Sequence, residues 1–299
     1  MSFTFIFTRC LFLRRSLWLD TYKSKDIFMS DNSFSVAAIC QEAVGMVRAN
    51  LLAIVIACIP LIVVHTIFIT QYQGALVQGS QEPDFSSVGA GFFVTTFLLY
   101  PLVAAMAVVR IHRIYLAHEY MHSALDVMRL SMRELRFIGW WILFGLSMMF
   151  TLALPIFIVT FLYAAEGGEA SELTFTIITL LASIPGHWIL SRWSLVLPAT
   201  ALDREPRSLD DAWRQSKPYN KQIFVLMGLI PLLVGAVNQF IFAEFNHILA
   251  FVVSGVIFGI FGAYQIALLS LSYRTILNIE RAKFKGVPDS QSDAYEFRG

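Results

Sequence analysis

The sequence predicts an all-α membrane protein with six transmembrane helices in three helical-hairpin repeats, each hairpin preceded by an interfacial amphipathic helix. Three observations lead to this fold. The 299 residues are 57% apolar and only 14% charged, whereas about a quarter of the residues of a soluble domain carry charge. Apolar stretches long enough to cross a bilayer occur six times. Basic residues are confined to alternate connecting segments, as in multi-pass membrane proteins.

The six predicted spans follow from the thickness of a bilayer. A hydrocarbon core about 30 Å thick needs roughly 20 apolar residues in a helix, because unpaired backbone groups are costly in lipid. The spans are Leu51 to Thr70, Gly91 to Val109, Phe137 to Ala164, Leu173 to Leu190, Ile223 to Phe242 and Ile248 to Leu271. These segments lack the polar face that a helix of a soluble bundle would show.

The distribution of basic residues predicts the orientation. All 22 lysine and arginine residues lie in four segments, which are residues 1–50, 110–136, 192–221 and 274–299. The three segments that alternate with these carry only acidic charge. Since lysine and arginine near span ends stay in the cytoplasm, both termini are expected on the cytoplasmic side.

Three parts of the chain are expected. Residues 1–28 look like a non-native extension, because arginines interrupt their apolar run and Met29 opens a polar cap that leads into a helix. Residues 29–283 form the membrane domain, and residues 284–299 form a flexible tail. The cysteines, Cys10, Cys40 and Cys58, show neither metal-binding spacing nor a disulfide framework.

An internal repeat divides the membrane domain into units of about residues 33–119, 120–205 and 206–283. The evidence is positional, as self-similarity at a fixed period is the sign of a repeat. Four residues recur 85 positions later, namely Ser123, Asp126, Arg129 and Ser131 as Ser208, Asp211, Arg214 and Ser216. Each first span also contains a proline, which is Pro60, Pro155 or Pro231, and proline kinks a helix.

Two cytoplasmic helices are predicted to start at Ser123 and Ser208. Each serine opens a Ser-x-x-Asp pattern, in which the serine oxygen accepts an amide hydrogen bond and the acid reaches back. The first helix is expected to run to about residue 135 with its apolar residues on one face and its charges elsewhere. The apolar residues are Leu125, Met128, Met132 and Leu135, and the charged ones are Asp126, Arg129, Arg133 and Arg136.

The stretch from Arg192 to Lys217 resembles a known family. Its signature residues are Arg192, Pro198, Asp203, Leu209, Ala212, Trp213 and Ser216. They are similar to the pattern of bacterial six-span proteins of the YciC-like kind and of the membrane domain of glycerophosphoryl diester phosphodiesterases. The resemblance implies a bacterial inner-membrane protein and no hydrolase chemistry, because the catalytic barrel has no counterpart here. Arg192 is expected to act as an interfacial anchor.

One motif raises a metal-site hypothesis. His118-Glu119-Tyr120-Met121-His122 fits H-E-x-x-H, which on a continuous helix places two imidazoles on one face to bind zinc. Three observations favour solvated histidines instead. A third ligand motif is not evident, Glu119 has a counterpart in Glu280 without histidines, and a new helix is predicted from Ser123.

Two histidines within the predicted spans, His65 and His187, are candidates for function because ionisable residues are rare in lipid. A neutral histidine hydrogen-bonded to a neighbouring helix is the favoured interpretation for each. A small-residue face in the sixth span, formed by Gly255, Gly259 and Gly262, suits close packing within the protein.

The whole pattern favours a structural, assembly or lipid-associated role in the bacterial inner membrane. It assigns no catalytic, cofactor-binding or metal-binding residues. Membrane lipids are the expected partner, nucleic acid is not expected, and a second copy or another membrane protein stays open. A transporter or channel built on proline-kinked repeats is the first alternative, and a membrane zinc metalloprotease using His118 to His122 is the second.

Overall fold

A computed structural model describes residues 34–76, 89–121, 123–165, 172–205, 207–242 and 248–284. Within these ranges the regular secondary structure is entirely helical. The helices belong to one compact unit, Ser35–Gly299. The predicted extension 1–28, the start at Met29, the side chain of His122 and nearly all of the predicted tail lie outside the described residues.

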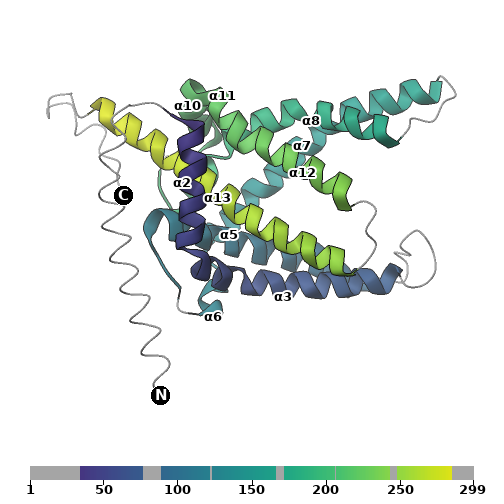
Figure 1. Ribbon diagram of the computed structural model, residues 1–299, viewed down its shortest axis with the longest axis horizontal. Helices are drawn as coiled ribbons and strands as arrows, with labels where there is room; N and C mark the ends of the chain where they lie inside the picture. Colours follow the sequence, from purple (N-terminus) through teal and green to yellow (C-terminus); the bar gives the residue numbers. More distant parts are fainter. Residues whose placement is uncertain are drawn as a thin grey trace, which may run out of the picture. The chain divides into compact units, whose positions relative to one another are not determined.

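The first part of the unit pairs a short amphipathic helix with two long apolar ones. Helix α2 (Val36–Ala49) begins at Ser35, whose side chain accepts a hydrogen bond from the Ala38 amide at 3.4 Å. It leads into α3 (Leu51–Leu76), and Figure 1 shows α2 running across the direction of α3. After the gap, α4 (Ala90–Val94), η1 (Thr95–Leu99) and α5 (Tyr100–Ala117) follow one another without a break.

The second part contains the longest hairpin. Its elements are α6 (Ala124–Val127), α7 (Met132–Ala165), α8 (Glu172–Trp193) and α9 (Val196–Ala201). Helices α7 and α8 pack together. They approach closely at Gly186, where an added Cβ would lie 2.5 Å from Thr151 Oγ1.

The third part starts with a polar helix and ends with the longest one. Its elements are α10 (Leu209–Ser216), η2 (Lys217–Tyr219), α11 (Asn220–Phe224), η3 (Val225–Leu229), α12 (Ile230–Phe242) and α13 (Ile248–Phe284). The π-helical turns η1 and η3 share a local cause. Each precedes a proline, Pro101 or Pro231, which has no amide hydrogen to continue the α-helical pattern.

The core forms where α5 crosses the second half of α13. Helices α5 and α13 pack against each other. In addition, α5 packs against α3, and α13 packs against α2. Fully buried apolar side chains at this crossing are Val109, Ile114, Leu268, Leu271 and Ile276. Tyr115 donates a hydrogen bond to the Ala263 carbonyl at 3.3 Å, so its hydroxyl is satisfied within the core.

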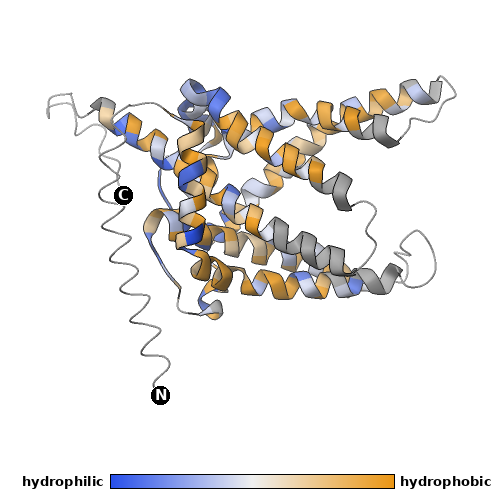
Figure 2. Cartoon of the chain, in the orientation of Figure 1, coloured by the Kyte–Doolittle hydropathy of each residue, from blue (hydrophilic) through white to orange (hydrophobic). Residues whose placement is uncertain are grey.

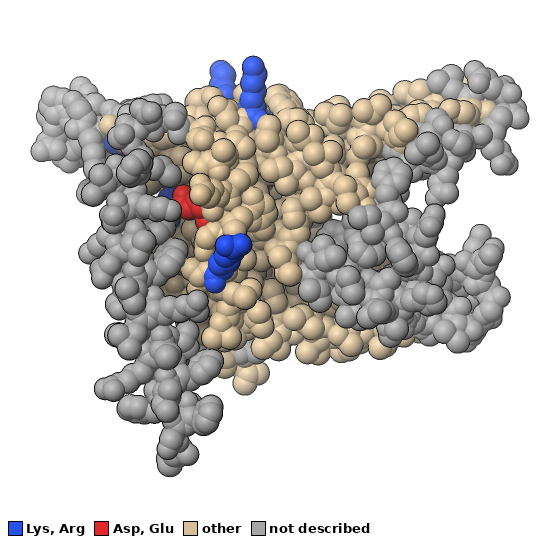
Figure 3. Space-filling view, viewed as in Figure 1, with Lys and Arg blue, Asp and Glu red and all other residues tan. Residues whose placement is uncertain are grey.

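Long apolar surfaces face outward along the spans. Helix α7 alone exposes many large apolar side chains, among them Leu146, Phe150, Leu154, Phe157 and Phe161. Figure 2 shows apolar residues along the lengths of α3, α7 and α12, and polar residues gathered around α10. The face seen in Figure 3 carries its charged residues toward one end of the described helices. An apolar surface of this extent needs a nonaqueous surrounding.

The protein is therefore embedded in a membrane, and the regular structure of its described residues is helical. Five helical segments of the described chain are long and apolar enough to cross a membrane. They are Leu51–Phe68, Ala90–Ala117, Met132–Phe161, Leu209–Val237 and Gly259–Ala282. Each overlaps a span predicted from the sequence.

The structure corrects the predicted helix from Ser123 to about residue 135. Its start is confirmed, since Ser123 caps α6 with both hydrogen bonds of a capping box. Its length is wrong, because α6 ends at Val127 after one turn and α7 begins at Met132. The physical reason is a second Ser-x-x-acid cap at Ser131 and Glu134 that starts a new helix.

The predicted start at Ser208 is confirmed as well. Ser208 caps α10 and accepts a hydrogen bond from the Asp211 amide at 3.1 Å. The expectation of close helix packing on the glycine face of the sixth span is not met at Gly259 and Gly262. Among the described residues, an added Cβ at either position would meet nothing within 4 Å.

Candidate functional site

The H-E-x-x-H segment does not form a continuous helix. Helix α5 ends at Ala117, and His118 takes a left-handed conformation with a φ of 55°. The amides of His118 and Glu119 both turn back to the Arg113 carbonyl, as at a helix end. The break predicted near His122 is therefore present. The helical register that would align two imidazoles on one face is not formed. Groups of three or more metal-ligating side chains are also absent from the part of the chain that the structure describes.

Glu119 has a structural partner instead. Arg113 Nε donates to Glu119 Oε2 at 2.7 Å, and the second guanidinium nitrogen contacts Oε1, so the pair is bidentate. The remaining nitrogen of Arg113 donates to the Ala201 carbonyl at 3.1 Å, at the end of α9. Arg113 thus joins the ends of α5 and α9. Arg113 and Glu119 are six positions apart in the sequence, and their ion pair spans the end of α5.

We expect the Glu119→Gln variant to keep its fold with a loss of less than about 1 kcal/mol, because ion pairs with an exposed partner contribute little. Purified wild-type protein should hold no stoichiometric zinc. Inductively coupled plasma mass spectrometry and thermal unfolding in detergent measure the two quantities. One zinc per chain that disappears in Glu119→Gln or His118→Ala would restore the metalloprotease hypothesis.

Glu134 is the most enclosed acid of the described chain, with 0% of its side chain exposed. It caps α7 by accepting from the Ser131 amide at 2.8 Å and from the Ser131 hydroxyl. Its other oxygen lies 3.6 Å from the Arg110 guanidinium of α5. Arg110 also donates to the Arg129 carbonyl at 2.9 Å. The pair therefore binds α5 to the loop between α6 and α7.

Glu134 is not among the residues singled out from the sequence. The signal in the sequence is the Ser131-x-x-Glu134 spacing. This spacing fits a capping box as well as the Ser-x-x-Asp pattern at Ser123 does. The helix predicted from Ser123 to about residue 135 runs through this spacing and so hides the cap. The sequence does not identify the ion-pair partner of Glu134, because Arg110 lies 24 residues earlier on another helix.

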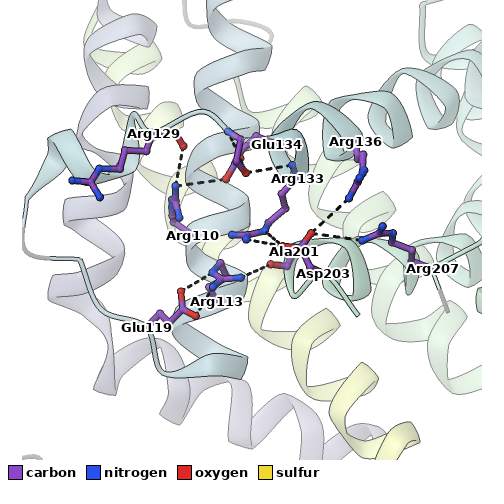
Figure 4. A network of polar contacts seen from close by, with 11 residues as sticks. Arg110, Arg113, Glu119, Arg129, Arg133, Glu134, Arg136, Ala201, Asp203 and Arg207 are labelled. Atoms are coloured by element: carbon purple, nitrogen blue, oxygen red, sulfur yellow. Dashed lines mark hydrogen bonds and ion pairs between the residues drawn. The ribbon is translucent and has the colours of Figure 1, made fainter. Parts of the chain in front are cut away.

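Asp203 is surrounded by arginines from two segments. Its backbone is left-handed with a φ of 52°, which turns the chain after α9. Arg133 Nε donates to Asp203 Oδ2 at 2.7 Å, while Arg136 and Arg207 lie 3.8 and 3.6 Å from Oδ1. Figure 4 shows these arginines converging on the one carboxylate. The resulting network joins the start of α7 to the turn after α9 and carries more positive than negative charge.

Arg192 holds α8 against α10. Its Nε donates to Ser216 Oγ at 3.0 Å and a terminal nitrogen donates to the Trp213 carbonyl at 2.6 Å. The guanidinium carbon lies 3.4 Å from the centre of the Trp213 ring and 5.5 Å from that of Trp188. Arg192 is 4% exposed. It is an internal clamp with cation–π contacts, where the sequence favoured an interfacial anchor.

The histidines occupy different settings. His187 Nδ1 lies 2.9 Å from the Ser183 carbonyl, so its hydrogen-bond partner belongs to its own helix and not to a neighbour. His65 packs among aromatic rings, with Tyr100 at 5.9 Å between ring centres, and its Nδ1 has no hydrogen-bond partner in the described residues. In the described residues, the favoured hydrogen bond to a neighbouring helix is therefore not formed at Nδ1 of His187 or at Nδ1 of His65.

A third histidine, His112, lies within the basic segment 110–136 and is not a candidate from the sequence. It is buried in α5, and its Nδ1 lies 2.8 Å from Ser270 Oγ of α13. It is thus a polar contact inside the α5 and α13 crossing. Its neighbours Arg110 and Arg113 concealed it, since a histidine between two arginines is typical of a solvated segment.

The polar residues of Figure 4 thus lie at one end of the helices, which we call the basic end. It comprises Arg110, Arg113, Glu119, Arg129, Arg133, Glu134, Arg136, Asp203 and Arg207. Chemically, this set can bind anions and join helices. Comparison of the chain with family models, characterised proteins and solved structures finds no match.

Proposed function

We propose that this chain is a six-span protein of the bacterial inner membrane with its basic end and both termini in the cytoplasm. Support for the fourth of the six spans, which is not among the five segments named above, comes from α8, because this helix contains the apolar stretch Leu173 to Leu190. Support for the orientation comes from the basic end itself, since arginine next to span ends is retained in the cytoplasm. The rule counts lysine and arginine alone, so the acids of the basic end do not weaken this assignment.

The three-repeat organisation is part of the same proposal. Support comes from three helices that each begin at a capping serine, Ser35, Ser123 and Ser208. In the second and third of these, an arginine pairs with the acid three residues before it, Arg129 with Asp126 and Arg214 with Asp211. These pairs fall at the positions that recur 85 residues apart. The first unit shares the serine cap but not the ion pair.

The role we propose is structural, assembly-related or lipid-associated, with membrane lipids as partners. One observation supports this role: the charged side chains of the basic end connect segments of the protein to one another. Arg110 and Arg113 of the basic end each connect two elements through hydrogen bonds, and Arg192 does the same between α8 and α10. Residues already engaged in this way fit a scaffold better than a catalytic site.

The family resemblance enters as part of this proposal. The signature at the fourth span contains Arg192, Trp213 and Ser216, which contact one another. The motif therefore consists of residues that pack α8 against α10. It supports a shared architecture with YciC-like proteins and with the phosphodiesterase membrane domain, and it carries no hydrolase activity.

A transporter or channel is a second candidate, favoured by the π-helical turns η1 and η3. Such turns are frequent at functional sites, and each of these precedes a proline, Pro101 or Pro231. Cysteine scanning of residues 95–99 and 225–229 with a charged, membrane-impermeant thiol reagent tests it. Labelling on the helix face turned toward other spans would support a water-filled path, and labelling of none would oppose it.

Reporter fusions test the proposed topology. We expect cytoplasmic reporter activity near Arg133, Arg207 and Lys283, and outer-face activity near Gln81 and Gly168, because the basic residues fix the sides. Alkaline phosphatase and green fluorescent protein fusions at each point give opposite signals. An inverted result at either member of a neighbouring pair, for example Arg133 and Gly168, would refute the six-span map.

A further inference from the structure

A short segment at the basic end exposes both apolar and basic side chains. This segment, residues 123–136, contains α6, the following loop and the first turn of α7. We call it the α6 segment. Its most exposed apolar side chains are Leu125 at 80% and Met132 at 69%, with Leu130 at 50%. Large apolar side chains that are this exposed are costly in water.

The α6 segment is anchored, so its exposed side chains have a fixed direction. Val127 is fully buried, and α6 packs against α3 and α5. The loop that follows is held by the hydrogen bond from Arg110 to the Arg129 carbonyl. The segment is thus attached to the protein, while Leu125, Leu130 and Met132 stay exposed.

Arginines flank these apolar residues. Arg129 is 82% exposed and lies 3.6 Å from the Asp126 carboxylate. Arg136 is 50% exposed, and its distance to Asp203 of 3.8 Å is the longest of the three arginines around that acid. Figure 4 shows Arg129 extending away from the network while Arg133 points into it. Two arginines are therefore available at the surface beside exposed leucine and methionine.

Helix α10 provides an internal comparison. It has the same serine cap and the same arginine-to-acid ion pair, and Arg214 is 71% exposed. Large apolar side chains in α10 are not exposed, since Leu209 and Trp213 are half-buried and Ala212 is buried. The combination of exposed apolar side chains with arginine therefore separates the α6 segment from α10.

We propose that the α6 segment is a binding surface for anionic phospholipid, in which Leu125, Leu130 and Met132 enter the edge of the acyl region and Arg129 and Arg136 contact lipid phosphates. This inference rests on the proposed lipid-associated role and adds the lipid class. Exposed apolar residues next to arginine are the pattern of interfacial segments that favour anionic lipid. The charge complementarity of arginine and phosphate selects phosphatidylglycerol over the zwitterionic phosphatidylcholine.

The test measures the lipids next to residue 125 in the full-length protein. A fluorophore is attached to Leu125→Cys in a background without Cys10, Cys40 and Cys58. The protein is reconstituted into phosphatidylcholine vesicles that contain spin-labelled phosphatidylglycerol or, in a matched set, spin-labelled phosphatidylcholine. We expect quenching by both, with phosphatidylglycerol favoured about fivefold per arginine, because one basic side chain at an anionic surface contributes about 1 kcal/mol. Arg129→Gln and Arg136→Gln should each lower that preference, and high salt should lower it too.

The matched control places the fluorophore on Asp210→Cys, which has the same position after the capping serine of α10 as Leu125 has after that of α6. We expect weak quenching there. Arg214→Gln should leave the preference at residue 125 unchanged. Equal quenching by both lipids, or a preference that survives Arg129→Gln and Arg136→Gln, would overturn the proposal. So would quenching at residue 125 no stronger than at residue 210, as expected if the segment binds another protein and does not enter the bilayer. None of these results alters the reporter-fusion topology, so the proposed function can stand when this inference fails.

Discussion

Replacing Glu134 by alanine should lower the free energy of unfolding by about 3 kcal/mol, because a buried charge that loses its partner is left uncompensated. Glu134 is fully enclosed and lies 3.6 Å from the Arg110 guanidinium, which is only 17% exposed. The same change removes the cap of α7, since the Ser131 amide loses its acceptor. Unfolding of the purified protein by dodecyl sulfate in mixed micelles measures the loss.

A double-mutant cycle separates the two contributions. Arg110→Met alone should be destabilising, while Glu134→Met combined with Arg110→Met should recover part of the loss, because a buried pair can often be replaced by apolar residues. Glu134→Gln keeps an acceptor for Ser131 and should retain the cap but not the charge. Additive losses in the double variant would show that Glu134 and Arg110 do not interact.

Replacing Arg192 by alanine should also cost about 3 kcal/mol or more. The change removes two hydrogen bonds from a charged donor, to Ser216 Oγ and the Trp213 carbonyl, each of about 1.5 kcal/mol or more. It also removes the cation–π contact with Trp213 at 3.4 Å, which adds about 1 to 2 kcal/mol. The same unfolding measurement applies, and limited proteolysis should show α10 cut first.

Arg192→Lys is the matched control. Lysine keeps the charge but lacks the planar fork that meets two acceptors and a ring face at once, so it should recover less than half of the loss. Trp213→Leu keeps the backbone carbonyl and removes the ring, and should lose the cation–π contribution together with the edge contact of Trp213 with Trp188. Wild-type stability in Arg192→Ala would contradict the role of Arg192 as a clamp between α8 and α10.

The sequence by itself determined the helical class, the membrane setting and the starts of the capped helices. These features depend on local chemistry. An apolar run has to leave water whatever it packs against, and a Ser-x-x-acid cap is complete within four residues, as at Ser123 and Ser208. A break near the H-E-x-x-H segment was also predictable from local chemistry, because the cap pattern at Ser123 marks the start of the next helix.

Only the tertiary structure decided which polar residues meet. Glu134 with Arg110, Asp203 with Arg133, His112 with Ser270 and Arg274 with Glu42 all join segments far apart in the chain, and no local spacing encodes such a partner. The structure also divided the predicted helix after Ser123, since Ser131 and Glu134 form a competing cap. Its buried acid is stable there because α5 brings Arg110 beside it. Local hydrogen bonds can thus be read from neighbouring residues, whereas burial of a charge depends on which distant helix supplies the opposite one.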